Sequence, residues 1–183
     1  MIKKRSLWFT SPFQIEIKET AIKALQPEQM LVKSLFSAIS PGTEMLLYRG
    51  EQPTDMMADE NIPKLRSSMS YPLQYGYAIV GTVVETGSAV DPSWKGRNVF
   101  AFHPHESHFV TSPDLVSPLP NTVSPETALF LHNMETAVSF VMDGAPIIGE
   151  RAIVFGQGIV GLLTTTLLAQ FPFAELVGVD PYE

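Results

Sequence analysis

Three closely spaced glycines occur near the C-terminal end of the 183-residue sequence. Gly156, Gly158 and Gly161 form the pattern G-x-G-x-x-G within VFGQGIVG, between a predicted strand and a predicted helix. In such a turn the first glycine permits the tight bend, the second admits a pyrophosphate to the backbone, and the third lets the helix pack on the strand. A bound phosphate would lie against free N–H groups at the positive end of the helix dipole. The predicted cofactor-binding turn consists of Gly156, Gln157, Gly158, Ile159, Val160 and Gly161.

An acidic residue stands where such a turn requires one. Strands are predicted over 151–155 and 175–180, a helix is predicted between them, and Asp180 ends the second strand, 19 residues after Gly161. A carboxylate there accepts hydrogen bonds from ribose hydroxyls and repels a 2′-phosphate, so we expect NAD rather than NADP. Glycines that serve only helix–strand packing are the alternative. The order of strand, turn, helix, strand and acid favours the dinucleotide site.

Histidines form a second group of candidate residues. The segment FHPHESH places His103, His105 and His108 within six residues. If the backbone is extended there, His103 and His105 face the same side, about 7 Å apart along the strand. Imidazoles titrate near neutral pH, so these side chains could transfer a proton, or bind a metal ion together with Glu106 or His132. A polar strand end with solvated imidazoles is the third interpretation.

Two tyrosines and two glutamates allow similar alternatives. Tyr77 or Tyr48 could donate a proton to a carbonyl oxygen, although a buried ring with its hydroxyl at the rim is commoner. Glu44 and Glu135 could orient an imidazole or a donor group, or stabilise the first turns of helices. A short helix that starts at Thr43 favours this helix-capping role for Glu44.

The elements that must position these residues are short strands in the N-terminal part of the chain. Phe13, Ile15 and Ile17 alternate with polar residues, as in a half-buried strand, and Gly81 indicates a bulge or a close backbone approach. Frequent Pro and Gly between the strands favour a small β-barrel. Residues 51–70 are polar and aperiodic, which predicts a mobile loop. The predicted strands of this part cover 11–19, 29–40, 77–87, 97–102 and 107–110.

Helices follow the predicted barrel. Ser124 is a predicted N-cap with Pro125 at the first helical position, and a second helical pattern over 134–144 ends at Gly144. The sequence therefore predicts a mixed α and β protein with three parts. They are a barrel domain at 1–123, a helical connector at 124–149 and a partial dinucleotide-binding domain at 150–183.

Composition excludes several classes of partner. The chain is 45% hydrophobic and 17% charged, as globular proteins are, and its net charge of −7 argues against nucleic acid. The absence of cysteine excludes disulfides and thiolate metal sites. No apolar run approaches the roughly 18 residues of a membrane span. We expect no membrane association, no secretory signal and a cytoplasmic protein.

Four stretches together carry a resemblance to a known family: 40–50 (SPGTEMLLYRG), 75–102, 133–138 (NMETAV) and 154–161 (VFGQGIVG). They resemble the medium-chain dehydrogenase/reductase family, which includes zinc-type alcohol and threonine dehydrogenases. The resemblance covers nearly the whole chain. It implies a GroES-like β-barrel followed by the first βαβ of a Rossmann fold. It also implies an NAD(P)-dependent oxidoreductase that transfers a hydride to or from a small carbonyl or alcohol substrate.

The chain departs from the family's zinc enzymes at all three positions of the protein ligands. Pro41 stands in place of a ligand cysteine, Tyr77 and Ala78 replace a ligand histidine and the glutamate after it, and His132 aligns with a third ligand that is usually cysteine. Because zinc needs three protein ligands, we expect no metal at the inherited site. In the resemblance, His103 aligns with a residue lining the substrate pocket. The candidate catalytic residues are His103, His132 and Tyr77.

Only the first two strands of a dinucleotide fold precede Glu183. We therefore expect Glu183 to be a truncation point, and a chain that ends there to be inactive alone. The open edges of strands 151–155 and 175–180 predict a homo-oligomer. Two other functions remain open. One is a zinc-independent quinone or enoyl reductase, and the other is a non-enzymatic GroES-like binding or assembly module with a vestigial cofactor turn.

Overall fold

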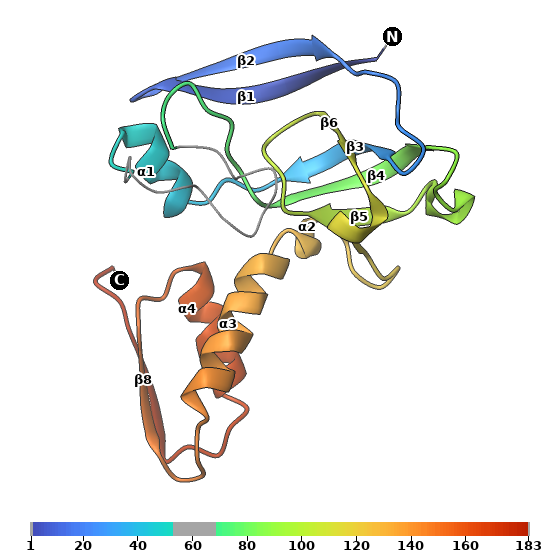
Figure 1. Ribbon diagram of the computed structural model, residues 1–183. Coiled ribbons are helices and arrows are strands. Elements are labelled where there is room, and N and C mark those ends of the chain that lie inside the picture. Colours follow the sequence, from blue (N-terminus) through green and yellow to red (C-terminus); the bar gives the residue numbers. More distant parts are fainter. Residues whose placement is uncertain (1, 53–68, 183) are drawn as a thin grey trace. The chain divides into compact units, whose positions relative to one another are not determined.

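The computed structural model describes residues 2–52 and 69–182 (Figure 1). The chain divides into two compact units, Met1–Leu129 and Phe130–Glu183. The first unit contains two β-sheets and short helices, and the second contains two helices and two parallel strands. Most of the loop predicted at 51–70 falls outside the described residues.

The first sheet is an antiparallel hairpin of β1 (Lys3–Ser11) and β2 (Gln14–Ala21). Phe13 occupies the turn with a φ of 60°. The register pairs Phe9 with Ile15, so these two side chains lie on one face of the hairpin. The strand predicted at 11–19 is therefore β2, displaced toward the C-terminus by the turn. It is more exposed than its alternating pattern predicts, since Ile15 retains 54% of its accessible surface.

The second sheet holds the main hydrophobic core of the first unit. Its strands are antiparallel in the order β6-β3-β4-β5-β7, and apolar side chains such as Met30, Ile79 and Phe109 are fully buried beside it. A Cβ on Gly81 would lie 2.5 Å from the Lys33 carbonyl oxygen, next to a register shift, which confirms the close approach predicted there. The strands are β3 (Met30–Ser37), β4 (Ile79–Thr86), β5 (Asn98–Ala101), β6 (His108–Thr111) and β7 (Ser117–Pro118).

The two sheets of the first unit do not form a closed barrel within the described residues. Strand β1 of the hairpin makes only isolated bridges, Ser6 to Glu106 and Phe9 to Leu73, to segments that precede β6 and β4. Closure, which the strand pattern predicted, is thus not observed, because β1 meets the segments near 73 and 106 at single residues.

In the part of the first unit that the structure describes, short helical segments lie between the strands of the second sheet and after its last strand. The N-cap predicted at Ser124 is confirmed, since its hydroxyl accepts the Thr127 N–H at 3.2 Å. The segments are α1 (Thr43–Arg49), the 3-10 helices Pro92–Trp94 and Pro113–Leu115, and α2 (Pro125–Ala128).

The second unit follows the predicted order of elements. Strands β8 and β9 pair in parallel, from Arg151 with Glu175 to Phe155 with Val179. The helix expected to end at Gly144 does so, but the left-handed cap residue is Ala145, with a φ of 42°. The elements are α3 (Leu131–Gly144), β8 (Arg151–Phe155), α4 (Ile159–Leu168) and β9 (Glu175–Val179). In the described ranges no helix is long and apolar enough to cross a membrane.

Candidate functional site

The glycine turn between β8 and α4 has the geometry that its spacing predicts. Gly156 has a φ of 85°, a backbone conformation that favours glycine, and its N–H donates to the Val179 carbonyl at 2.7 Å. A Cβ on Gly161 would lie 1.8 Å from the Gly156 carbonyl oxygen, so the helix can pass this close to the turn only with glycine there. A Cβ on Gly158 would meet no atom within 4 Å. The chain itself therefore leaves room for a side chain at Gly158, next to the N-terminus of α4.

Asp180 lies directly beside this turn. Its Oδ2 accepts the Gln157 N–H at 2.6 Å and its Oδ1 accepts the Tyr182 N–H at 2.9 Å. The hydrogen bond from Gln157, followed by that from Tyr182, lowers the pKa of the Asp180 carboxyl below its usual value. An ionised carboxylate thus lies after the C-terminal end of β9, and each of its oxygens retains a lone-pair site for a ligand hydroxyl.

The Gln157 side chain supports the turn from inside the unit. Its Nε2 donates to the Val154 carbonyl at 3.1 Å, and its Oε1 accepts the Thr165 hydroxyl at 3.2 Å. The side chain also lies against Gly178, where a Cβ would come within 3.0 Å of the Gln157 carboxamide carbon. The side chain of Gln157 therefore stabilises the turn, and its backbone N–H binds Asp180. The motif alone does not predict this role of the side chain.

Helix α4 presents its N-terminus to the same turn. Its N-cap is Gly158, and neither a side-chain cap nor an acidic residue occupies its first turn. The first N–H groups of a helix lack intrahelical acceptors, and the positive end of the helix dipole lies there. The glycines, the open helix end and the carboxylate of Asp180 together fit the pyrophosphate and the ribose of a dinucleotide.

His103 is buried in the first unit, beside an acidic residue. Its ring stacks on Phe109 with centroids 4.5 Å apart, and only 6% of the residue is accessible. Its Nδ1 lies 3.0 Å from the Pro104 carbonyl oxygen. With Lys4 and Glu106, His103 lines a pocket of about 380 Å³. The interpretation of His103 as a solvated strand end is therefore wrong.

Glu106 is the most extensively hydrogen-bonded carboxylate of this region. Its Oε1 accepts hydrogen bonds from Lys4 Nζ at 2.6 Å, from the Ser6 hydroxyl at 2.7 Å and from Gln74 Nε2 at 3.1 Å. Burial raises the pKa of Glu106, but the hydrogen bonds from Lys4 and Ser6 and the charge of His103 outweigh it and hold the pKa below its usual value. From the sequence, Glu106 is a candidate only as a metal ligand. Its hydrogen-bond donors Lys4, Ser6 and Gln74 are far from it in the chain, so no local pattern predicts these hydrogen bonds.

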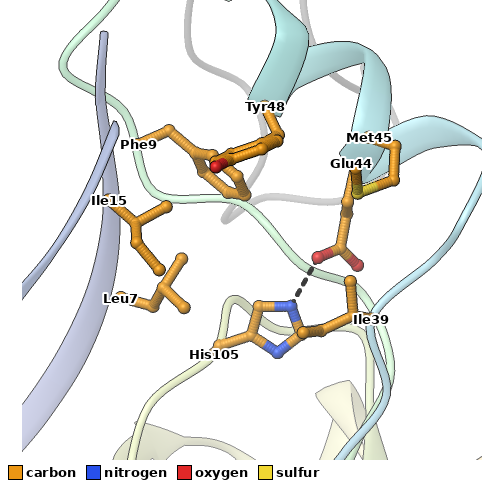
Figure 2. A pocket seen from close by; sticks show the side chains of 8 residues that line it. All are labelled: Leu7, Phe9, Ile15, Ile39, Glu44, Met45, Tyr48 and His105. Atoms are coloured by element: carbon orange, nitrogen blue, oxygen red, sulfur yellow. Dashed lines mark hydrogen bonds and ion pairs between the residues drawn. The ribbon is translucent and has the colours of Figure 1, made fainter. Parts of the chain in front are cut away.

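His105 lies in a different pocket from His103. Its Nε2 is 2.7 Å from Glu44 Oε2, and both side chains are buried (Figure 2). The predicted same-side arrangement needs an extended strand at 102–105, but β5 ends at Ala101. Glu44 also accepts the Ser40 N–H at 3.0 Å, so it both orients an imidazole and stabilises the start of α1.

The remaining candidates are separated by the division of the chain. Tyr77 packs against two apolar clusters of the first unit and contacts Tyr75 edge-on, with ring centroids 6.0 Å apart. His132 is half-buried on α3 of the second unit. His108 starts β6, where burial, followed by the charge of Lys33, lowers its pKa. His103 lines the pocket of about 380 Å³, and Tyr77 is not among the residues that line it.

Metal ligands do not gather in the part of the chain that the structure describes. It contains no group of three or more His, Asp or Glu residues that could hold a metal ion. Pro41 is exposed just before α1, and Ala78 is buried in the core.

Comparison with known proteins identifies distant relatives. No family model matches the sequence. The D-guloside 3-dehydrogenases of Shigella flexneri and Escherichia coli K12 are each 23% identical over 189 residues, which cover 97% of this chain. The chain spans about half of the length of these relatives, 54%.

Solved structures share the fold. A short-chain alcohol dehydrogenase from Escherichia coli CFT073, in complex with NADH, matches 99% of the chain with a TM-score of 0.76 and 16% identity. A dehydrogenase from Sinorhizobium meliloti 1021, in complex with NADP, matches 99% of the chain with a TM-score of 0.73 and 19% identity. The chain covers 63% of each of these two structures. Its mixed α/β fold therefore corresponds to part of these larger proteins.

Proposed function

Because the chain is a distant relative of the medium-chain dehydrogenase/reductase family, we propose that the protein is an NAD-dependent oxidoreductase. It would transfer a hydride between the nicotinamide and the carbonyl or alcohol carbon of a small molecule. The relatives in sequence are dehydrogenases, and relatives in structure were solved with NADH and NADP. Since the chain spans about half of the curated relatives, the proposal concerns the whole protein.

The glycine turn carries this proposal. The chain leaves open space around Gly158, so packing does not explain a glycine there. A pyrophosphate at the N-terminus of α4 supplies that reason, because a Cβ at this position would lie between the phosphate and the backbone N–H groups. The ionised Asp180 next to Gln157 favours NAD, since a 2′-phosphate would meet its negative charge.

The chemistry would be divided between cofactor and protein. A nicotinamide cofactor supplies the hydride acceptor or donor when bound. The residues of the turn bind the pyrophosphate, and Asp180 orients the adenosine ribose. Among His103, His132 and Tyr77, His103 has the strongest support as the group that moves a proton. Its buried imidazole lies close to the Glu106 carboxylate, which stabilises a positive charge on the ring.

The residues at the family's zinc positions favour a zinc-independent reaction. Pro41 has no donor atom and Ala78 has no carboxylate, so the chain lacks the groups that would hold and orient a catalytic zinc there. A zinc-independent reductase of the quinone or enoyl type is therefore the second candidate function, and its substrate would be a quinone or an activated alkene. We further infer that the hairpin β1–β2 and the five-stranded sheet are parts of a GroES-like barrel.

Titration of the full-length protein with NADH and NADPH, followed by nucleotide fluorescence, tests the proposal. Wild-type protein should bind NADH more tightly than NADPH, and Asp180→Ser should reduce this preference. Gly158→Ala should lower the NADH affinity at least tenfold, about 1.4 kcal/mol. It should leave the melting temperature unchanged, because the new Cβ meets no atom of the chain.

Gly144→Ala provides the matched control. A Cβ on Gly144 would likewise meet no atom within 4 Å, and this residue lies at the end of α3, outside the turn. NADH affinity should therefore stay at the wild-type value in Gly144→Ala. Wild-type affinity in Gly158→Ala, or full-length protein that binds neither nucleotide, would overturn the proposal.

A further inference from the structure

A second pocket of the first unit lies between the β1–β2 hairpin and helix α1 (Figure 2). We call it the hairpin pocket. Leu7, Phe9 and Ile15 of the hairpin form one wall, and Ile39 and Met45 lie on the side of α1. Its volume is about 210 Å³. An apolar cavity of about 150 Å³ already binds benzene, so the hairpin pocket has room for one substituted ring.

One end of the hairpin pocket is polar and is formed by Glu44 and His105. Glu44 is only 1% accessible, and its Oε2 lies 2.7 Å from Nε2 of His105. The other carboxylate oxygen accepts the Ser40 N–H. Nδ1 of His105 is buried and has no hydrogen-bond partner within the described residues, and neither a lysine nor an arginine lines the pocket. An anionic ligand would be buried next to the Glu44 carboxylate with no lysine or arginine to pair with, which disfavours acidic ligands on desolvation grounds.

Tyr48 supplies a polar group of a different kind. Its ring covers the pocket next to Phe9, and it contacts Phe13 edge-on with centroids 5.5 Å apart. Its hydroxyl oxygen lies on the side of Phe9 and the hairpin (Figure 2). The phenol hydroxyl can both donate and accept, and tyrosines on apolar surfaces usually use it. It can therefore bind a neutral hydroxyl on a ligand.

We propose that the hairpin pocket binds a small uncharged molecule that consists of one apolar ring with a hydroxyl group. The ring packs against Leu7, Ile15 and Met45, and the hydroxyl pairs with that of Tyr48. The hydrogen-bonded Glu44–His105 pair forms the polar end, and its carboxylate disfavours an anionic ligand. This site lies within the first unit and uses none of the residues of the nucleotide turn.

Binding of phenol to the full-length protein tests this proposal, with benzoate as the anionic probe of the same ring size. Saturation-transfer NMR and calorimetry are carried out without nucleotide. We expect saturable phenol binding and at least tenfold weaker benzoate binding. Tyr48→Phe should weaken phenol binding about fivefold, the usual effect of one lost hydrogen bond.

A pair of tryptophan variants locates the site. Ile15 and Ile17 lie on the same face of β2 and are 54% and 55% accessible, but only Ile15 lines the pocket. Ile15→Trp should fill the pocket and abolish phenol binding, whereas Ile17→Trp should bind phenol as the wild type does. Both variants should retain wild-type NADH affinity, which separates this site from the nucleotide turn.

Three results would each overturn the proposal. They are the absence of saturable phenol binding up to its solubility limit, equal affinities for phenol and benzoate, and equal losses in Ile15→Trp and Ile17→Trp. Failure of NADH binding with intact phenol binding would count against the proposed function alone.

Discussion

At the scale of single residues, the two buried imidazoles show how strongly the surroundings separate similar side chains. His103 stacks on Phe109 close to Glu106, whereas His105 is within 2.7 Å of Glu44. The ring of His105 also lies where a Cβ on Gly76 would come within 2.8 Å of it. Each histidine therefore has its own acidic neighbour.

Replacing Glu106 with Gln tests the buried carboxylate. At neutral pH, Glu106→Gln should lower the free energy of unfolding by about 2 kcal/mol, because Lys4 and Ser6 lose a charged acceptor. The folded pKa of Glu106 lies below its usual value of 4.5, so its stabilisation is present above that value and is lost as the pH falls through the folded pKa. The difference between wild type and variant should shrink on acidification. Urea unfolding at pH 7 and below pH 4.5 measures it, and a constant difference would contradict the assignment.

The metal content tests the residues at the family's zinc positions. We expect the purified protein to carry no stoichiometric zinc after dialysis, since Pro41, Tyr77 and Ala78 supply no ligand set. Elemental analysis measures the content. One zinc per chain, lost in His103→Ala or His105→Ala, would instead reveal a replacement site at the histidines.

At the scale of elements, the turn between β8 and α4 depends on a close backbone contact. A Cβ on Gly161 would lie 1.8 Å from the Gly156 carbonyl oxygen. Because this oxygen belongs to the backbone, no side-chain movement can remove the clash. The helix can keep its distance to the strand only if this position carries no side chain. Packing therefore requires glycine at position 161, whereas the chain leaves open space at Gly158.

Gly161→Ala should destabilise the second unit by about 1–3 kcal/mol, because α4 must move away from the turn. Hydrogen exchange of α4 amides should accelerate, while the first unit keeps its protection. Gly144→Ala serves again as a control without a close contact. Wild-type exchange in α4 of Gly161→Ala would show that the turn accommodates the methyl group.

At the scale of the whole molecule, the second unit offers apolar surface and strand edges. Within the described residues β8 pairs only with β9. Several of their side chains are substantially exposed: Ile153, Phe155, Val177 and Val179. Open strands with apolar side chains are templates for pairing with another chain.

We expect a polypeptide of residues 1–183 to self-associate through 151–183. If it stays monomeric, this segment should be poorly ordered, because two strands alone are marginally stable. Light scattering of this polypeptide, compared with one of residues 1–149, distinguishes the outcomes. A monodisperse monomer whose residues 151–183 are fully protected from hydrogen exchange would contradict both.

The same polypeptide should bind NADH weakly and show no dehydrogenase turnover. Its single βαβ supplies contacts to the pyrophosphate and one ribose, through the turn and Asp180, but not the later strands on which the nicotinamide lies in a complete dinucleotide fold. Calorimetric titration measures the affinity. A micromolar dissociation constant would show that one βαβ suffices.

Local features were readable from the sequence alone. The pattern of glycines and Asp180 predicts the elements β8, α4 and β9, because a tight turn with a positive φ and short apolar runs constrain their own neighbourhood. Strand β8 has its predicted bounds, and β9 ends one residue before the predicted end. The N-cap at Ser124 is predictable for the same reason, since its partner Thr127 is three residues away.

Only the tertiary structure decided which distant groups meet. Lys4 contacts Glu106 across 102 residues and Glu44 contacts His105 across 61, and neither pairing has a local pattern. The same holds for the hairpin, whose strand β1 makes the single bridges Ser6–Glu106 and Phe9–Leu73 to segments between the strands, without closing a barrel in the described residues. Long-range contacts depend on how complete sheets pack, because burial and charge compensation are properties of the assembled fold and not of any one segment.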